Sequence, residues 1–348
     1  MPIVQQPIDR ATWTELFNAA SQLAALEPWR FATEGDVFGL TDLGTGEVRL
    51  GHILGDAEMV FAAVVYRKGG VRWLLSTLDD KAVFSPEGAL EAMDCVKLEW
   101  VLKRELEKED LAAVAASGVK IQARGPNWPQ FRSSRPGWHP WHLNAGEARQ
   151  MVSDLRQLTA MLRVFKARPD FFDGRALAEV PFLRAGVSDR EPGPDDLEWR
   201  SIVPPPEEPS RPVKVAESDL ARLRALKRIP DLCLDFDARL MPTASFIQDG
   251  RPCFGRVGLA VETEEGMAVG VEVQGGDKPV GEAAVSCLIA ILLKIKVLPA
   301  CLNVGTARFK TVLQPLCSEL GISLGFAEEM PFLEEAYESM GGDLMPPL

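Results

Sequence analysis

The chain has 348 residues, of which 46% are hydrophobic and 25% charged, with 50 acidic against 38 basic side chains. These proportions are ordinary for a soluble globular protein, and they exclude an intrinsically disordered chain, a collagen-like repeat and a small disulfide-rich fold. At about 150 residues per domain, the length predicts roughly two domains.

The first 186 residues are expected to form an α+β domain. Apolar residues at helical spacing predict a helix over Ala11–Leu26. Short apolar segments separated by glycine-containing turns then predict an antiparallel meander. The segments are Val37–Leu40, Glu47–Leu54, Met59–Tyr66 and Val71–Ser76.

The same domain continues with a predicted helix over Glu105–Ser117 and a predicted strand over Val119–Ala123. Asn144 and Glu147 then have the spacing of a capping box, which predicts a long helix from there to about Arg168.

Residues 187–214 contain seven prolines among acidic side chains. Proline fixes φ and removes a hydrogen-bond donor, so neither a helix nor a central strand is expected here. We expect an extended, semi-rigid connector with the domain boundary near residue 200.

Residues 215–348 are expected to form an α/β domain. Ser218 is a predicted cap for a helix over Asp219–Arg228, and Pro230 should end that helix. A strand over Leu232–Asp237, a hairpin turn at Asp249 and Gly250, and a strand over Val269–Val273 follow. Helices and strands then alternate: helix Val280–Lys296, strand Ala300–Val304, helix Arg308–Leu320, strand Ile322–Phe326 and a last helix from Pro331. This order predicts a sheet with helices on both faces.

The chain shows neither a secretory signal nor a membrane span. Its first residues lack the basic region and apolar core of a signal peptide. The longest apolar run, Ala283–Leu293, is shorter than the roughly 20 residues that a bilayer requires. The six cysteines are scattered without a CxxC pair, which favours reduced, buried thiols. We therefore expect a cytoplasmic protein without membrane contact.

The order of elements in the second domain resembles the ribonuclease H-like fold of nucleases and of transposase and integrase cores. That resemblance implies carboxylates on the first strand, the fourth strand and the last helix, which together hold two magnesium or manganese ions. The corresponding positions in this chain are Asp235 or Asp237, Asn303, and Glu334 or Glu335.

Asn303 departs from the pattern that the resemblance implies. A neutral amide holds a divalent cation more weakly than a carboxylate does. We therefore expect an inactive site without a resident cofactor. In the alternative, the domain is a magnesium- or manganese-dependent nuclease or related phosphoryl-transfer enzyme centred on Asp235, Asp237 and Glu334.

Both halves of the chain also resemble a two-domain family of uncharacterised bacterial proteins. The resemblance rests on W-x-x-L…LEPW near the N-terminus, WPQFRSSRPGWHPW in the middle and LNVGTARFKTVLQPLCSELGIS near the C-terminus. It implies the two-domain architecture and no particular activity.

Residues 118–169, here called the basic segment, carry nine basic and two acidic side chains, whereas the whole chain has a net charge of −12. A basic face on an acidic body attracts an anionic partner, either a nucleic acid or an acidic protein. Tryptophan faces interleaved with arginine suit stacked bases and phosphates. The predicted contact residues are Trp128, Arg132, Arg135, Trp138, His139 and Trp141. Alternatively, the rings pin a proline-rich loop to the core, and the arginines form one solvated helix face.

No sequence motif assigns a further chemistry. His139 and His142 flank Pro140 without a nearby cysteine, so no metal site is predicted there. Phosphate-binding and nucleophile-elbow motifs are absent from the sequence. We conclude from the sequence that the protein is a non-catalytic binding or interaction protein. A purely structural partner, which would expose an apolar patch, is a third reading.

Overall fold

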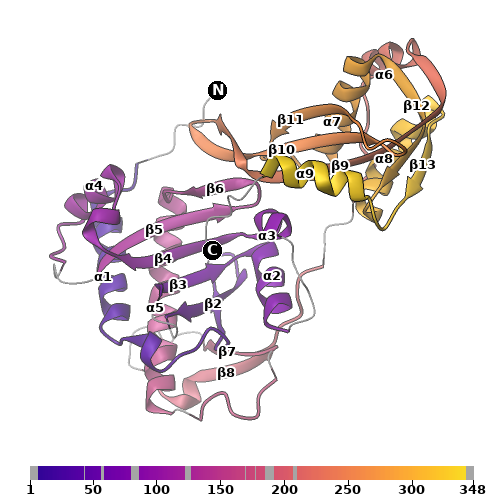
Figure 1. Ribbon diagram of the computed structural model, residues 1–348. Helices are drawn as coiled ribbons and strands as arrows, with labels where there is room; N and C mark the ends of the chain where they lie inside the picture. The colour runs from indigo at the N-terminus through magenta and orange to yellow at the C-terminus, as the bar shows by residue number, and fades with distance from the viewer. Residues whose placement is uncertain are drawn as a thin grey trace. The chain divides into compact units, whose positions relative to one another are not determined.

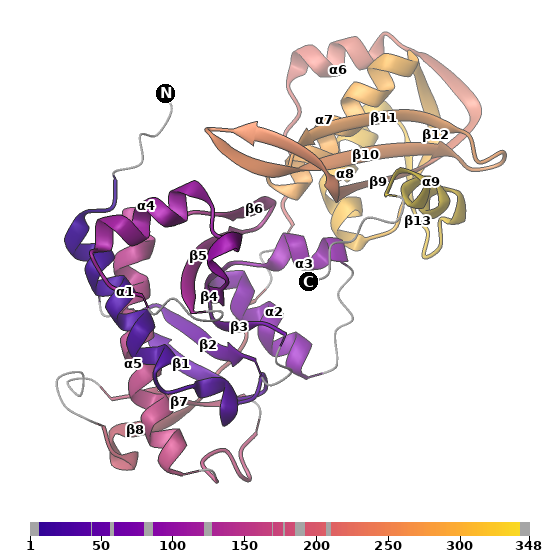
Figure 2. The same cartoon turned by 60° about the vertical axis from the view of Figure 1, so that its left-hand side comes forward.

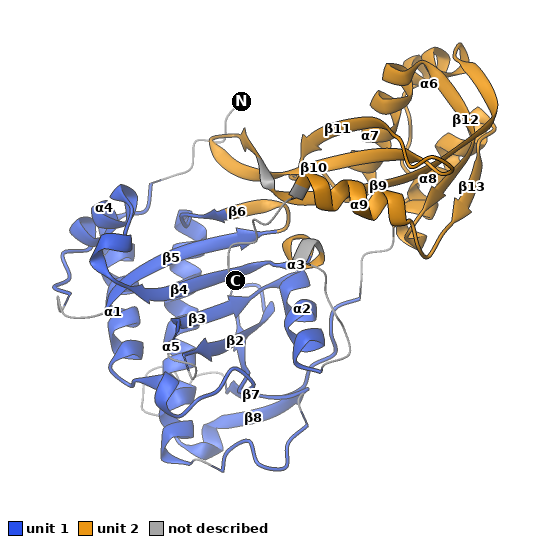
Figure 3. Ribbon diagram, viewed as in Figure 1, with its two compact units in different colours: residues 1–85, 92–135, 140–206 blue, residues 86–91, 136–139, 207–348 orange. Residues whose placement is uncertain are grey.

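The computed structural model describes residues 7–42, 44–55, 59–79, 86–121, 127–168, 170–176, 178–184, 192–206 and 210–341. The chain divides into two compact units, which Figure 3 shows in separate colours. Unit 1 comprises residues 1–85, 92–135 and 140–206, and unit 2 comprises residues 86–91, 136–139 and 207–348. Within the described ranges, no helix combines the length and apolarity that crossing a bilayer requires.

Unit 1 is built on a sheet in which strands β5, β4, β3, β2, β1, β7 and β8 lie in that order, with β6 beside β5. Strands β1 and β7 are parallel, whereas β5–β4–β3–β2–β1 and β7–β8 pair antiparallel. The strands are β1 Phe38–Thr41, β2 Val48–Leu54, β3 Phe61–Tyr66, β4 Cys95–Val101, β5 Trp128–Arg135, β7 Glu179–Leu183, β8 Leu197–Ser201 and β6 Trp138–Trp141, of which the first two residues are assigned to unit 2. The helices are α1 Arg10–Ala24, α2 Lys68–Leu78, α4 Lys108–Ser117 and α5 Ala145–Ala167, with short 3₁₀ turns at Pro28–Arg30, Lys103–Glu105 and Pro194–Asp196. Helix α3, Pro86–Ala92, belongs to unit 2 up to residue 91.

Alternation along the strands of unit 1 supplies a core on each face of the sheet. On β3, Ala63 and Val65 join the core beneath α1 and α5, whereas Val64 and Tyr66 join the core beneath α2. Figures 1 and 2 show α1 and α5 on one face and α2 on the other. This is the period-two pattern of a sheet that is buried on both sides.

Unit 2 has strand order β11, β10, β9, β12, β13. Strands β9, β10 and β11 are antiparallel, and β9, β12 and β13 are parallel. The strands are β9 Lys227–Gln248, β10 Arg251–Glu262, β11 Ala268–Gly275, β12 Val297–Val304 and β13 Ser323–Phe326. The helices are α6 Glu217–Arg224, α7 Val280–Ile295, α8 Ala307–Leu320 and α9 Pro331–Gly341.

The two faces of β9 differ in chemistry. Leu234, Phe236 and Ala238 belong to the core that includes residues of α6, α7 and α8. Because side chains alternate along a strand, Asp235 and Asp237 belong to the opposite face. That face is covered by α9, through a second core that includes Leu333.

Several expected boundaries differ from the structure. Val71–Ser76 lies in helix α2 rather than in a strand, because Val71, Leu74 and Leu75 form one buried helical face. The predicted helix Asp219–Arg228 ends at Arg224, because Lys227 and the next two residues pair with β12.

The segment expected as a connector contains a strand. Residues 197–201 form β8, which lies at the end of the strand order, where only one side of the strand is paired. The predicted strand Val119–Ala123 is not formed over 119–121, and its last two residues lie outside the described ranges.

The expectation of six reduced cysteines is wrong for one pair. Cys233 on β9 and Cys301 on β12 are joined by a disulfide, with Cα atoms 4.7 Å apart. The parallel register places them directly beside each other, although 68 positions separate them in the sequence. Four free cysteines are buried: Cys95, Cys253, Cys287 and Cys317.

Candidate functional site

The candidate metal-binding residues that the sequence singled out, three acidic and one amide, come from three elements of unit 2. Asp235 and Asp237 lie on β9 and are both 7% exposed, Asn303 lies on β12, and Glu334 lies in the first turn of α9. The β9–β12 register pairs Asn303 with Asp235, and the Nδ2 amide of Asn303 donates to Asp235 Oδ1 at 3.0 Å. Gly325 on β13 leaves room for the Asn303 side chain, because a Cβ atom at position 325 would lie 2.4 Å from Asn303 Oδ1.

Arg239 occupies the space between the other two carboxylates. Its Nε donates to Asp237 Oδ2 at 2.7 Å, and its Nη1 donates to Glu334 Oε2 at 2.6 Å. Its Nη2 donates to the other oxygen of Glu334. The guanidinium also lies over the ring of Tyr337, 4.4 Å from its centroid. The Tyr337 hydroxyl donates to the Asp237 carbonyl at 3.0 Å.

The electrostatics of this cluster follow from the guanidinium. Burial raises the pKa of Asp237 above its ordinary value, against the attraction of Arg239. Hydrogen bonds from Arg239 hold the pKa of Glu334 below its ordinary value. Burial disfavours the charge on Arg239, but its hydrogen bonds with Glu334 and the charge of Asp237 outweigh this and raise its pKa. The cation is therefore fixed between two carboxylates.

The acidic cluster does not have the geometry of a metal site. In the part of the chain that the structure describes, one group of three His, Cys, Asp or Glu side chains has its ligand atoms within 4.8 Å of one another. That group is Glu107, Glu109 and His142 in unit 1, and it excludes Asp235, Asp237 and Glu334.

The arginines of the WPQFRSSR strand are paired with carboxylates of unit 1. Arg132 is 9% exposed and donates to both oxygens of Asp110, at 2.7 and 2.8 Å. Burial disfavours the charge of Asp110, but the hydrogen bonds from Arg132, the Glu107 backbone N–H and Gln130, together with the charge of Arg132, outweigh burial and lower the pKa of Asp110. Arg135 donates to Glu147 at 2.9 Å, and Arg67 donates to the same oxygen at 3.0 Å.

The aromatic residues of the same region are half-buried. Trp128 carries the ammonium of Lys103 over its ring at 5.1 Å, and Trp141 lines a cavity of about 260 Å³ with Trp13 and Phe131. Trp138 and His139 belong to unit 2, where the guanidinium of Arg251 lies 5.3 Å from the ring of Trp138. His139 packs 3.9 Å from the ring of Phe254, and its Nε2 lies 2.9 Å from Ser245 Oγ.

A groove of about 700 Å³ runs along α5 in unit 1. Arg149, Arg156 and Arg163 line it at intervals of seven residues, which keeps them on one helix face. Glu15, the acidic residue among the described lining, pairs with Arg156 at 3.0 Å. Thr159 also lines the groove, and its buried hydroxyl has no hydrogen-bond partner in the described structure.

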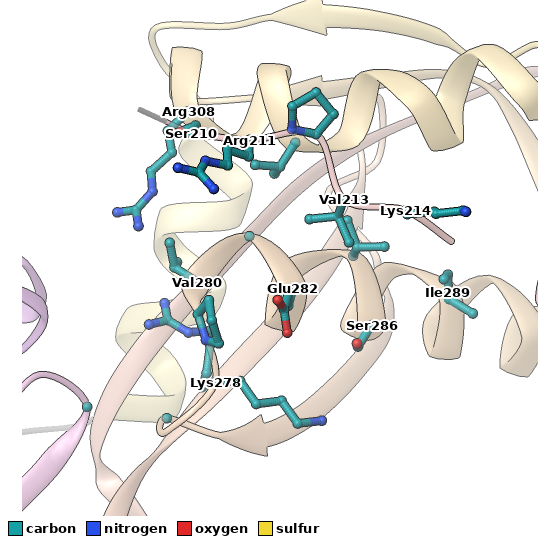
Figure 4. Close-up of a pocket in the computed structure, with 18 of the residues that line it drawn as sticks. Ser210, Arg211, Val213, Lys214, Lys278, Val280, Glu282, Ser286, Ile289 and Arg308 are labelled. Carbon is teal, nitrogen blue, oxygen red and sulfur yellow. The ribbon is translucent and has the colours of Figure 1, made fainter. Parts of the chain in front are cut away.

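A larger cavity of about 1130 Å³ lies in unit 2. Figure 4 shows Arg211, Val213 and Lys214 on one side of it, with Glu282 and Ser286 of α7 facing them. Its charges nearly balance, since five basic and four acidic side chains line it. Glu91 neutralises two of the basic groups, at 2.6 Å from Arg256 and 3.3 Å from Arg308. The lining therefore favours neither an anion nor a cation.

Comparison with family models finds two matches. Residues 13–180 match the model described as Domain of unknown function (DUF7309), and residues 219–341 match Domain of unknown function (DUF6930). The three groove arginines of α5 lie within the residues that match DUF7309, whereas the acidic cluster around Arg239 lies within the residues that match DUF6930.

Comparison with curated proteins finds no match. Among solved structures, a chain of the "CryoEM structure of simian T-cell lymphotropic virus intasome in complex with PP2A regulatory subunit B56 gamma" is 15% identical, with a TM-score of 0.23. The match covers 35% of this chain and 46% of that chain, so this chain spans about half the length of the one it matches.

Sequence reasoning missed Arg239, and it considered the arginines of the long helix only as part of the basic segment or as one solvated helix face. Arg239 follows Asp237 by two positions and therefore lies on the same strand face, which is a visible signal in D-F-D-A-R. Arg149, Arg156 and Arg163 repeat every seven residues within a predicted helix, and this repeat already places them on one face.

Proposed function

We propose that this protein is a non-catalytic binding protein and that its DUF6930 domain is an inactive member of the ribonuclease H-like fold. The strand order β11-β10-β9-β12-β13, with the first three strands antiparallel and the rest parallel, supports the fold assignment. The main observation in favour of an inactive site is that the guanidinium of Arg239 lies between Asp237 and Glu334 and donates to both.

The physical argument concerns competition for the carboxylates. A two-metal site requires anionic oxygens that converge on the ions. Here the oxygens of Asp237 and Glu334 accept hydrogen bonds from a fixed cation, and Asp235 accepts one from the neutral amide of Asn303. A divalent ion would have to displace the Arg239 guanidinium, which already balances the negative charge of Asp237 and Glu334. Asn303 is neutral and supplies no negative charge that would favour the ion.

Hydrolysis assays test the catalytic half of the proposal. The full chain is incubated with single-stranded DNA, RNA and an RNA–DNA hybrid in Mg²⁺ or Mn²⁺, beside the Asp235→Asn variant. We expect no hydrolysis above that of the Asp235→Asn variant with any substrate. Metal-dependent turnover that disappears in Asp235→Asn but persists in the control Glu338→Gln, an exposed change on α9, would contradict the proposal.

For the binding role, we propose that the α5 groove accepts single-stranded nucleic acid. Arg149 and Arg163 are exposed and have no ion-pair partner in the described structure, so their charges are available to phosphates. This moves the expected contact from Arg132 and Arg135, whose charges are matched by carboxylates, to another part of the basic segment. An acidic protein is the alternative partner for the same surface.

Fluorescence anisotropy with labelled single-stranded DNA and RNA at several salt concentrations tests the binding role. Binding should weaken steeply with salt, and Arg149→Ala with Arg163→Ala should lower the slope of log K against log salt by about 1.4. The control Arg104→Ala, an exposed arginine that does not line the groove, should leave the slope unchanged. No binding at low salt would contradict the nucleic-acid role.

A bacterial, cytoplasmic origin remains part of the proposal. Four buried free cysteines support a reducing compartment, whereas the Cys233–Cys301 disulfide argues for an oxidising one. Alkylation of the protein in freshly lysed cells, followed by mass spectrometry, shows whether Cys233 and Cys301 are reduced or oxidised and so distinguishes the two compartments. A fully oxidised Cys233–Cys301 pair in those cells would contradict a cytoplasmic location.

A further inference from the structure

Hydroxyl side chains alternate with the arginines of the α5 groove. The arginines and hydroxyl residues that line it follow one another along the helix in the order Arg149, Ser153, Arg156, Thr159 and Arg163. At 1.5 Å and about 100° per residue, neighbours in this series are about 4.5–6 Å apart along the axis, and the two hydroxyl residues lie on either side of the row of arginines. A strand that follows the arginines therefore passes both hydroxyls.

The hydroxyl of Thr159 lacks the partner that a buried polar group requires. The residue is 4% exposed, and its Oγ1 makes no hydrogen bond within the described part of the chain. Helical threonines can bond the carbonyl four positions earlier, but Thr159 does not bond Leu155. A buried hydroxyl in this state destabilises the fold. Its position in the lining of a groove is explained by a ligand that supplies the missing hydrogen bond.

Ser153 is half-buried and supplies a second, more accessible hydroxyl. Its Oγ accepts from Gln157 Nε2 at 3.2 Å, which leaves the hydroxyl proton of Ser153 for donation to a ligand. Gln157 is itself fixed against β1, because its Nε2 donates to the Thr41 carbonyl at 3.0 Å and its Oε1 accepts from the Thr41 N–H at 3.1 Å. Packed structure therefore holds the Ser153 hydroxyl in place.

A hydroxyl and a guanidinium recognise different parts of a nucleic acid strand. A guanidinium only donates hydrogen bonds and matches phosphate oxygens, whereas a hydroxyl both donates and accepts. The sugars of the strand lie between its phosphates, and the ribose 2′-hydroxyl also both donates and accepts. It is the group by which a protein distinguishes RNA from DNA. Hydroxyls placed between phosphate-binding arginines therefore match ribose.

We propose that the α5 groove selects single-stranded RNA over DNA, with Ser153 and Thr159 bonding ribose 2′-hydroxyls between phosphates held by the three groove arginines. This inference rests on the nucleic-acid role proposed above and adds the substrate class. The ion pair of Arg156 with Glu15 does not block the middle of the groove, because both side chains are more than half exposed and such a pair is weak.

Fluorescence anisotropy of the full chain at low salt compares labelled single-stranded RNA, DNA and 2′-O-methyl RNA of one sequence. We expect RNA to bind at least about threefold more tightly than the other two, since one net hydrogen bond changes a binding constant by about 2- to 12-fold. In the double variant Ser153→Ala with Thr159→Val, the three affinities should agree within about a factor of two. Replacing the unpartnered Thr159 hydroxyl by a methyl group should not lower the free energy of unfolding, which denaturant unfolding of the variant checks.

The matched control is Ser318→Ala with Thr311→Val, which makes the same two changes at exposed positions of α8 and should keep the preference for RNA. Equal affinity for RNA and DNA in the unchanged protein, or equal affinity for RNA and 2′-O-methyl RNA, would overturn this inference and leave the nucleic-acid role standing. A preference for RNA that persists in the groove double variant would also overturn it, because the two hydroxyls would not be its source. Failure to bind RNA or DNA at low salt would overturn the nucleic-acid role and this inference together.

Discussion

Replacing Arg239 by alanine is expected to destabilise unit 2 strongly. The side chains of Asp237 and Arg239 are 10% and 22% exposed, so the substitution leaves a nearly buried carboxylate without its cation. Breaking a buried ion pair in this way costs about 3–5 kcal/mol. Glu334 is half exposed, so the loss of its pairing adds less than about 1 kcal/mol. We expect a total near the middle of that range, about 4 kcal/mol.

Denaturant unfolding measures the change, and hydrogen exchange with mass spectrometry assigns it to unit 2. The double variant Asp237→Leu with Arg239→Met should recover most of the loss, because replacing both members of a buried pair by apolar groups is often neutral. Arg222→Ala, which breaks an exposed pair with Asp219 on α6, should cost about 0.5 kcal/mol or less. A loss below about 1 kcal/mol for Arg239→Ala, or a greater loss in the double variant, would refute the reasoning.

Three further changes test other parts of the structure. Burial raises the pKa of Asp154 to about 6, so the stability that its protonated carboxyl contributes to the folded state is lost as pH rises from about 4 to 6. Denaturation measured at each pH should therefore show the Asp154→Asn variant gaining up to about 3 kcal/mol relative to wild type over that interval. A stability difference between variant and wild type that is independent of pH would contradict the raised pKa. Gly258→Ala places a Cβ 2.4 Å from Cys287 Cβ and should lower the free energy of unfolding by about 1–3 kcal/mol. In the control Gly35→Ala, the new Cβ would be 3.7 Å from Thr33 Oγ1, and the change should be tolerated. Equal unfolding midpoints for the two variants would show that the predicted clash is absent. Reducing the Cys233–Cys301 disulfide should destabilise unit 2 by about 2–4 kcal/mol, and identical unfolding curves with and without reductant would argue against the bond.

Long periodic segments were predictable from the sequence. The capping box at Asn144 and Glu147 begins α5, and the Asp249–Gly250 turn joins β9 to β10. Helix α2 was predicted as a strand, because a short apolar run fits both periods until its neighbours are known. The extra length of β9 depends on its pairing with β12, about 70 positions away, which no local pattern contains.

The sites depended even more on contacts between distant residues. The charge count of the basic segment treated Arg132 as free, because Asp110 lies 22 positions earlier and outside the counted segment. Asp237 and Glu334 were both candidates, but only the folded chain places Arg239 between them. Residue types and strand order indicate where carboxylates gather, whereas the ion pairs that decide their chemistry form only in the tertiary structure.

Helix α9 protects a surface that would otherwise promote self-association. Leu333 and Tyr337 pack on Val257, Leu259 and Val261 of the sheet. Proteolytic cleavage between β13 and α9 would allow α9 to detach and expose these apolar residues together with the buried Asp237. Aggregation after limited digestion would therefore begin at this end of unit 2, and its severity would report how firmly the last helix is held down.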